Sequence, residues 1–159
     1  MHFPGGPIYG GVLSYNNAPH VCFKVELPLR GSTDDEVPRL LERHLHTRFD
    51  SARVIKTGFL APLAVELRAG TKTFSAVLGR SKYEDGEWVL IVGPLKSPGL
   101  LDRLFGRKPV SEVPELILTC REIHQMLTAI SGITAVRWYF VGRNTQSAAV
   151  ATADELPWP

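Results

Sequence analysis

The chain contains few cysteines and no long hydrophobic run. Only two of its 159 residues are cysteines, and Cys22 and Cys120 lie too far apart in sequence to have the spacing of a metal site. The longest uninterrupted apolar run extends from Trp88 to Val92, whereas a helix that crosses a bilayer needs about 20 apolar residues. No apolar signal segment follows Met1. We therefore expect no membrane span and a reducing, cytoplasmic setting.

Neither positive nor negative charge is in large excess. The chain has 18 Lys and Arg residues against 16 Asp and Glu residues, which gives a formal net charge of +2. Domains that bind nucleic acid through its phosphates usually have a much larger basic excess. Nucleic acid is therefore not the expected partner, and nucleic-acid binding is kept only as a second alternative.

The recognised catalytic and cofactor motifs are absent as well, including the phosphate-binding loop, the nucleophile elbow, the paired-cysteine zinc patterns and the His-Glu-x-x-His helix. Cys120 and His124 are four residues apart, so on a helix they would share one face and could bind a metal or activate the thiol. Two ligands make an incomplete metal site, and Cys120 lies on the apolar stripe of a predicted helix. We expect both residues to be structural, and we predict no catalytic residue, metal or cofactor.

Two further histidines lie close together in sequence. His44 and His46 are two residues apart, so on a helix they point in different directions and cannot share a metal or a proton. We expect His44 at the edge of the core and His46 paired with Glu42, one turn earlier on the helix surface.

The length of the chain and its 44% hydrophobic content are sufficient for one compact core and too small for two full domains. We expect a single domain over residues 1–159. Within it we distinguish a loop-rich N-terminal segment (1–19), a short basic apolar insertion (96–109) and a C-terminal tail (143–159).

Two helices are predicted from a phrase that occurs twice. At Glu36-Val37-Pro38 and at Glu112-Val113-Pro114, a Ser or Thr precedes an acidic residue, a proline falls in the expected first helical turn, and an apolar run with helical spacing follows. The first helix has an apolar stripe from Val37 to Phe49, and the second extends from about Glu112 to Ile130 and stops at Gly132. Because a strand-like segment follows each helix, the repeat is consistent with a pseudo-duplication.

Six strands are predicted around these helices. The clearest runs from Val21 to Leu29, where apolar residues alternate with Cys22, Lys24 and other outward positions, as in a strand with one buried face. Turn residues at Ala69-Gly70 and Asp85-Gly86 favour antiparallel hairpins. The segment Glu87 to Val92 is apolar on both faces, which indicates a central position. The other predicted strands are Arg53 to Phe59, Leu63 to Arg68, Lys72 to Leu78 and Ile133 to Val141.

These elements together predict an α+β fold. Their order along the chain is β-α-β-β-β-β-α-β, and we expect two helices packed on one face of a mainly antiparallel sheet.

The insertion 96–109 is the first candidate for partner binding. It has the capping and stop residues of a short helix, and its residues from Lys96 to Lys108 include four basic residues and one acidic residue, a local charge of +3. Apolar side chains ringed by cations would suit a docking surface for an acidic protein partner, or a weak contact with a membrane surface. The opposing interpretation is that these side chains fold back onto one end of the core. The expected binding residues are Leu100, Leu101, Arg103, Leu104, Phe105, Arg107 and Lys108.

The last predicted strand supplies a second candidate. Its alternation directs Val136, Trp138 and Phe140 to one face, and Arg137 and Tyr139 to the other. Tyr and Arg are residue types that contribute strongly to interfaces, so Arg137 and Tyr139 are added to the predicted partner-binding residues. The structural alternative has these residues in the sheet, with Trp158 covering a sheet edge.

We therefore predict a non-catalytic protein-interaction module, such as an adaptor, a secretion-type chaperone, or a small inhibitor or immunity protein. The alternative is a small-ligand-binding protein or an enzyme with a pocket between the sheet and the helices. The sequence makes no prediction of oligomeric state.

Overall fold

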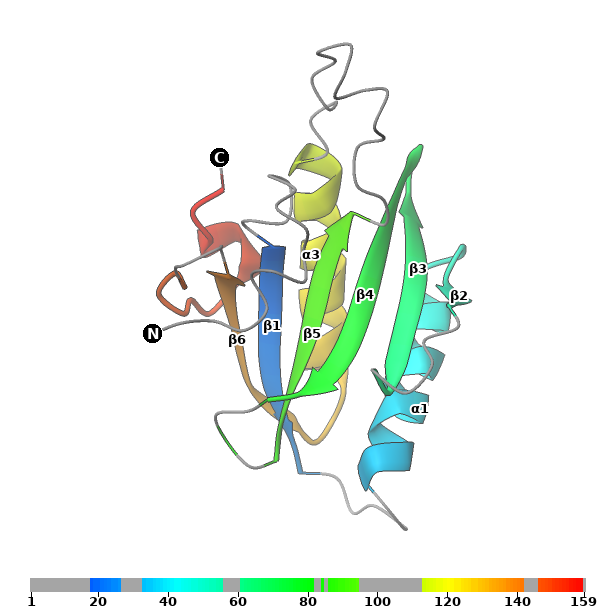
Figure 1. The fold of residues 1–159 in the computed structure, drawn as a ribbon, viewed down its shortest axis with the longest axis vertical. Coiled ribbons are helices and arrows are strands. Elements are labelled where there is room, and N and C mark those ends of the chain that lie inside the picture. Colours follow the sequence, from blue (N-terminus) through cyan, green and yellow to red (C-terminus); the bar gives the residue numbers. More distant parts are fainter. Residues whose placement is uncertain are drawn as a thin grey trace.

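The computed structural model describes residues 18–26, 33–55, 61–81, 84, 86–94, 113–141 and 146–158. Within these ranges, two helices lie on the same face of a six-stranded antiparallel sheet (Figure 1). The predicted α+β class and the order β-α-β-β-β-β-α-β are confirmed. The elements are β1 (Ala18–Val25), α1 (Thr33–Arg48), β2 (Arg53–Val54), β3 (Leu63–Ala69), β4 (Lys72–Arg80), β5 (Glu87–Pro94), α3 (Val113–Ala129), β6 (Ile133–Val141) and the 3-10 helix η3 (Ala153–Glu155).

The strands are arranged in the order β2-β3-β4-β5-β1-β6. The predicted hairpins join β3 to β4 and β4 to β5, with Gly70 (φ 63°) and Gly86 (φ 77°) in the left-handed conformation that their turns require. Strand β1 lies between β5 and β6, so His20 is opposite both Ile91 and Tyr139. This arrangement brings together three strands from distant parts of the sequence.

The core fills the space between the sheet and the two helices. Leu78, Leu90, Val21 and Trp138 lie opposite one another across β4, β5, β1 and β6, and none has any exposed surface. Burial of each side chain of this size contributes about 1.5–3 kcal/mol to the free energy of unfolding. The helices add their own stripes of fully buried side chains, namely Val37, Leu41 and Leu45 from α1 and Cys120, Ile123 and Leu127 from α3.

The structure differs from the sequence prediction at β1. The strand begins at Ala18 and ends at Val25, so Ala18 and Pro19 belong to the sheet and not to an N-terminal loop. Every residue from Ala18 to Phe23 is buried, whereas the alternation predicted one exposed face. The physical reason is the interior position of β1, where large side chains from β5 and β6 flank its second face as well. Leu27 and Leu29 lie outside the described residues.

Smaller differences occur in two other strands. Of the strand expected from Arg53 to Phe59, the structure describes residues 53–55 and places Arg53–Val54 in β2; residues 56–60 lie outside the described part. Strand β5 is an interior strand, as predicted, but its Val89 and Ile91 are only half-buried on the face away from the helices. The predicted pair of His46 with Glu42 is present at 3.8 Å.

The C-terminal residues cover the outer edge of β6. Trp158 packs edge-on against Phe140 with a ring-centroid distance of 5.0 Å, which confirms its expected place at a sheet edge. Neither helix among the described residues is long and apolar enough to span a bilayer.

Candidate functional site

The structure places the predicted partner-binding residues in two separate groups. Leu100, Leu101, Arg103, Leu104, Phe105, Arg107 and Lys108 lie outside the described residues, between Pro94 at the end of β5 and Val113 at the start of α3. Arg137 and Tyr139 lie together on the face of the sheet away from the helices, as the alternation predicted. Arg137 is level with Val89, several residues from Pro94, so it is not at the base of the insertion.

Arg137 and Tyr139 belong to a group of five side chains that we call the polar cluster: His20, Cys22, Glu87, Arg137 and Tyr139. The register explains how they meet. His20 on β1 lies opposite Tyr139 on β6, and Cys22 lies opposite Arg137. Glu87 enters from β5, on the other side of β1. The helix-free face of these three strands therefore contains a polar group whose members come from distant parts of the sequence.

Tyr139 is held by contacts within the chain. Its hydroxyl shares a hydrogen bond of 3.1 Å with the thiol of Cys22, and the imidazole of His20 stacks on its ring at a centroid distance of 5.5 Å. The Nδ1–H of His20 donates to the carbonyl oxygen of Ala18 at 2.9 Å. Only 7% of Tyr139 is exposed, so its side chain offers little surface to a protein partner.

Glu87 and Arg137 form an ion pair that is buried on one side only. Nη2 of Arg137 donates to Oε2 of Glu87 at 2.8 Å, and the side chains are 45% and 1% exposed, respectively. The other oxygen, Oε1, is buried and has no hydrogen-bond partner among the described residues. A buried carboxylate is stable only when partners replace the water that it has lost. Arg137 is therefore essential to this carboxylate.

The electrostatics of the cluster keep its thiol and its imidazole uncharged. Burial raises the pKa of Cys22, the hydrogen bond from Tyr139 opposes this rise, and the nearby Glu87 carboxylate adds to it. Burial lowers the pKa of His20 to about 4, although its bond to Ala18 acts in the opposite direction. Burial and the contact with Cys22 raise the pKa of Tyr139. At neutral pH, Cys22 is therefore a protonated thiol with low nucleophilicity.

Cys120 and His124 have different surroundings in the structure. Cys120 is fully buried in the core, and burial raises its pKa. His124 uses Nδ1 to accept a hydrogen bond of 3.1 Å from the indole N–H of Trp138. Both residues therefore have packing or hydrogen-bonding roles, as predicted.

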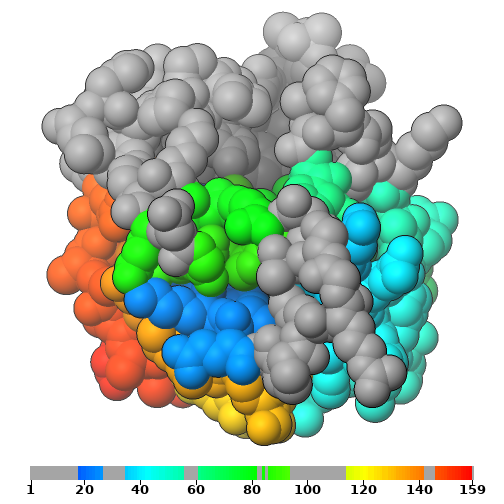
Figure 2. Space-filling model, turned by 90° about the horizontal axis from the view of Figure 1, so that it is seen from below, coloured from blue at the N-terminus to red at the C-terminus, as the bar shows by residue number. Residues whose placement is uncertain are grey.

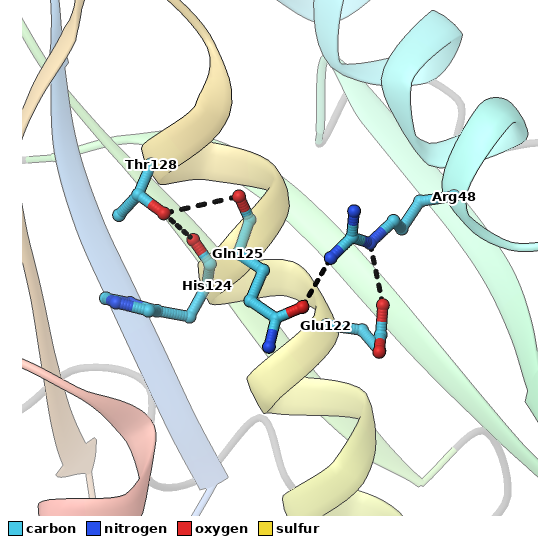
Figure 3. Close-up of polar contacts among 5 residues, drawn as sticks. All are labelled: Arg48, Glu122, His124, Gln125 and Thr128. Carbon is cyan, nitrogen blue, oxygen red and sulfur yellow. Dashed lines mark hydrogen bonds and ion pairs between the residues drawn. The ribbon is translucent and has the colours of Figure 1, made fainter.

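The contact between the two helices lies on another side of α3. Figure 3 shows Arg48 extending from α1 to Glu122 and Gln125 on α3, whereas His124 points to the opposite side of that helix. Nε of Arg48 donates to Glu122 at 2.6 Å. This contact joins the helix C-terminus of α1 to the middle of α3, and it is separate from the polar cluster.

Sequence reasoning missed His20, Cys22 and Glu87. The alternation in β1 placed Cys22 and Lys24 on an outward face, and His20 has the same parity. Glu87 is the single acidic residue in an otherwise apolar strand, and this was the signal in the sequence that could have identified it.

The described residues contain no group of three His, Cys, Asp or Glu side chains that could hold a metal ion. No family model, curated protein or solved structure matches this chain.

Proposed function

We propose that the chain is a non-catalytic protein-interaction module that docks an acidic protein partner through the insertion 96–109. An adaptor, a secretion-type chaperone and a small inhibitor or immunity protein would all work in this way. The observation that supports the proposal is the position of the insertion. In the sequence it falls between Pro94, where β5 ends in the sheet layer, and Val113, where α3 begins in the helix layer (Figure 1). A direct connection between two such elements needs only about 4–6 residues, so the segment 95–112 is long enough to carry an additional surface.

The charge distribution supports an acidic partner. Lys96, Arg103, Arg107 and Lys108 outnumber Asp102, so residues 96–108 have a formal charge of +3 against +2 for the whole chain; the remainder sums to −1. Complementary charge increases the rate of association and excludes like-charged partners, while apolar side chains supply affinity. The insertion contains both residue types.

A pull-down from native lysate tests the proposal with wild type and a Leu101→Glu/Phe105→Glu variant. We expect a specific partner that is captured by wild type and lost with the variant. Val54→Glu is the matched control, because Val54 is a 45% exposed apolar residue on β2, at one edge of the sheet, and its variant should capture the same partner. Circular dichroism verifies folding. If the double variant unfolds, the insertion is part of the core and the proposal fails.

Small-ligand binding is the second candidate function, and one observation favours it. The buried oxygen Oε1 of Glu87 has no hydrogen-bond partner among the described residues, and an amine or amide of a ligand could supply one. This group lies on the helix-free face, whereas the sequence-based alternative expected a pocket between the sheet and the helices, where the described side chains are apolar. A thermal-shift screen of small amines tests it: a ligand should stabilise wild type and not Glu87→Gln.

A further inference from the structure

The segment 146–158 folds back along the outer edge of β6. Backbone N–H groups of Trp138 and Val150 donate to each other's carbonyl oxygens at 2.8 Å, and Ser147 N–H donates to Phe140 at 2.9 Å. The N–H of Phe140 donates to the side-chain hydroxyl of Ser147 at 2.7 Å, where a paired strand would offer a backbone carbonyl. Figure 2 shows this segment along the side of the molecule next to β6, away from α1. The edge is therefore covered by a short and irregular pairing.

The far end of the segment is anchored on α3 and β6. Ala153 and Leu156 are 1% and 4% exposed and belong to the core, and the indole N–H of Trp158 donates to the carbonyl of Ala153 at 2.8 Å. Arg121 of α3 pairs with Asp154 of η3 at 2.7 Å, with about half of each side chain exposed. Burial of few apolar groups and one exposed ion pair is typical of a segment that opens locally before the rest of the fold.

Trp138 links this segment to His124. The backbone of Trp138 forms two hydrogen bonds with the backbone of Val150. Its fully buried indole N–H donates a hydrogen bond to Nδ1 of His124. A nitrogen that accepts this bond has no proton, so the neutral ring carries its proton on Nε2. Protonation of the ring places a second proton on Nδ1, where it meets the indole N–H. The two donors repel each other, and the indole N–H is left buried without an acceptor.

We infer that residues 146–158 form a pH-sensitive strap: protonation of His124 breaks its bond to Trp138 and loosens the strap, which bares the main-chain groups of Trp138 and Phe140 at the sheet edge. The trigger is a histidine at the junction of α3, β6 and the strap, and the responding part is the strap alone. This inference is independent of the proposed docking through residues 96–109.

The charges around His124 define the direction of the effect. Burial lowers the pKa of His124 below 6.5, and Asp154 on η3 opposes this shift. Arg121, one turn earlier on α3, is paired with Asp154. Trp138, the contact from β6, does not titrate. Since the closed state binds the proton more weakly than the open state, lower pH favours opening, by at most about tenfold for each pH unit when one proton is bound.

Amide hydrogen exchange measured by NMR at about pH 7.5 and about pH 5 tests the inference. After correction for intrinsic rates, we expect faster exchange at Ser147 and Val150 at the lower pH, by several-fold and within the tenfold-per-unit limit. The slowest amides of β3 and β4 report the pH dependence of global unfolding, from which the opening of the strap is distinguished. His124→Gln should remove this pH dependence. His46→Gln, which alters an exposed histidine on α1, should retain it. His20 is neutral in the folded chain in this range because its pKa is about 4; it takes up a proton only on global unfolding, so it affects the exchange of β3 and β4 and not the local opening of the strap.

The indole N–H resonance of Trp138 provides a second measurement that needs no variant. It should shift with the titration of His124, because that proton is donated to the ring. Equal exchange of the strap at both pH values, an unchanged pH dependence in His124→Gln, or an indole resonance that does not follow the titration of His124 would overturn the inference.

Discussion

Replacing Arg137 by methionine removes the cation that neutralises the carboxylate of Glu87. The side chain of Glu87 is 1% exposed, its Oε2 is bonded to Arg137, and its Oε1 has no partner among the described residues. Breaking a buried ion pair from one side typically costs about 3–5 kcal/mol, because the remaining charge is left without solvent. Arg137 is 45% exposed, so water enters its vacated position and reduces the effect. We expect the free energy of unfolding to fall by about 2–3 kcal/mol.

Arg53→Met is a matched control. Arg53 donates from the same atom, Nη2, to the same atom of Glu66, Oε2, at the same distance of 2.8 Å. That pair differs in burial, since Arg53 is 73% exposed and Glu66 is 21% exposed. We therefore expect Arg53→Met to cost less than about 1 kcal/mol. Urea denaturation followed by circular dichroism gives both free energies, with the m-values as a check on two-state unfolding.

A double variant, Glu87→Met/Arg137→Met, completes the test. It replaces the ion pair by two apolar side chains, and such replacements are often neutral or stabilising. We expect it to recover most of the stability that Arg137→Met loses. If Arg137→Met costs no more than Arg53→Met, or if the double variant is less stable than the single one, the carboxylate of Glu87 does not depend on Arg137 and the reasoning is wrong.

Three further predictions concern the polar cluster and the strap. The pKa of His20 is lowered from 6.5 to about 4, so between these pH values the unfolded chain binds a proton and the folded chain does not. We expect the free energy of unfolding to fall by about 3 kcal/mol as the pH is lowered across this range. In urea denaturation, the His20→Phe variant should lack this fall, and a fall that persists in the variant would show that His20 does not cause it. Tyr139→Phe takes the hydrogen-bond partner from the Cys22 thiol and should cost about 1 kcal/mol in urea denaturation; no loss would mean that this bond contributes nothing. Trp158→Ala removes the packing on Phe140 and should cost about 2 kcal/mol and lower Tm, whereas an unchanged Tm would show that the strap is not anchored there.

The helices and most strands could be predicted because their signals are local. The apolar spacing after the two Glu-Val-Pro phrases predicted helices that the structure places at Thr33–Arg48 and Val113–Ala129, and the alternation in the last strand predicted Ile133–Val141. The start of β1 was wrong because Pro19 and the preceding glycines and prolines indicate a loop when only neighbours in sequence are considered. A proline is accepted there by the pairing of β1 with β6.

The polar cluster could not be predicted, because it depends on the order of strands. Periodicity shows which residues share a face of one strand, but it does not show which strands are neighbours or whether the second face is covered. Cys22 and Tyr139 are 117 residues apart in sequence. They meet only because β1 lies between β5 and β6, and no local pattern encodes that order.

The same strand order gives the cluster a structural role that can be tested separately from ligand binding. Strands β3, β4 and β5 are joined by hairpins that fix their register, whereas β1 joins β5 and β6 without a hairpin. A slip of one residue in β1 would turn His20 and Cys22 toward the apolar core and separate them from Tyr139 and Arg137. We therefore expect the cluster to specify the register of β1. The Glu87→Met/Arg137→Met variant should be stable yet show extra or broadened NMR resonances in β1. Two apolar side chains can pack in more than one register of β1, whereas a buried ion pair requires one register to bring its charges together. A single sharp set of resonances would show that the hydrophobic pattern of β1 alone sets its register.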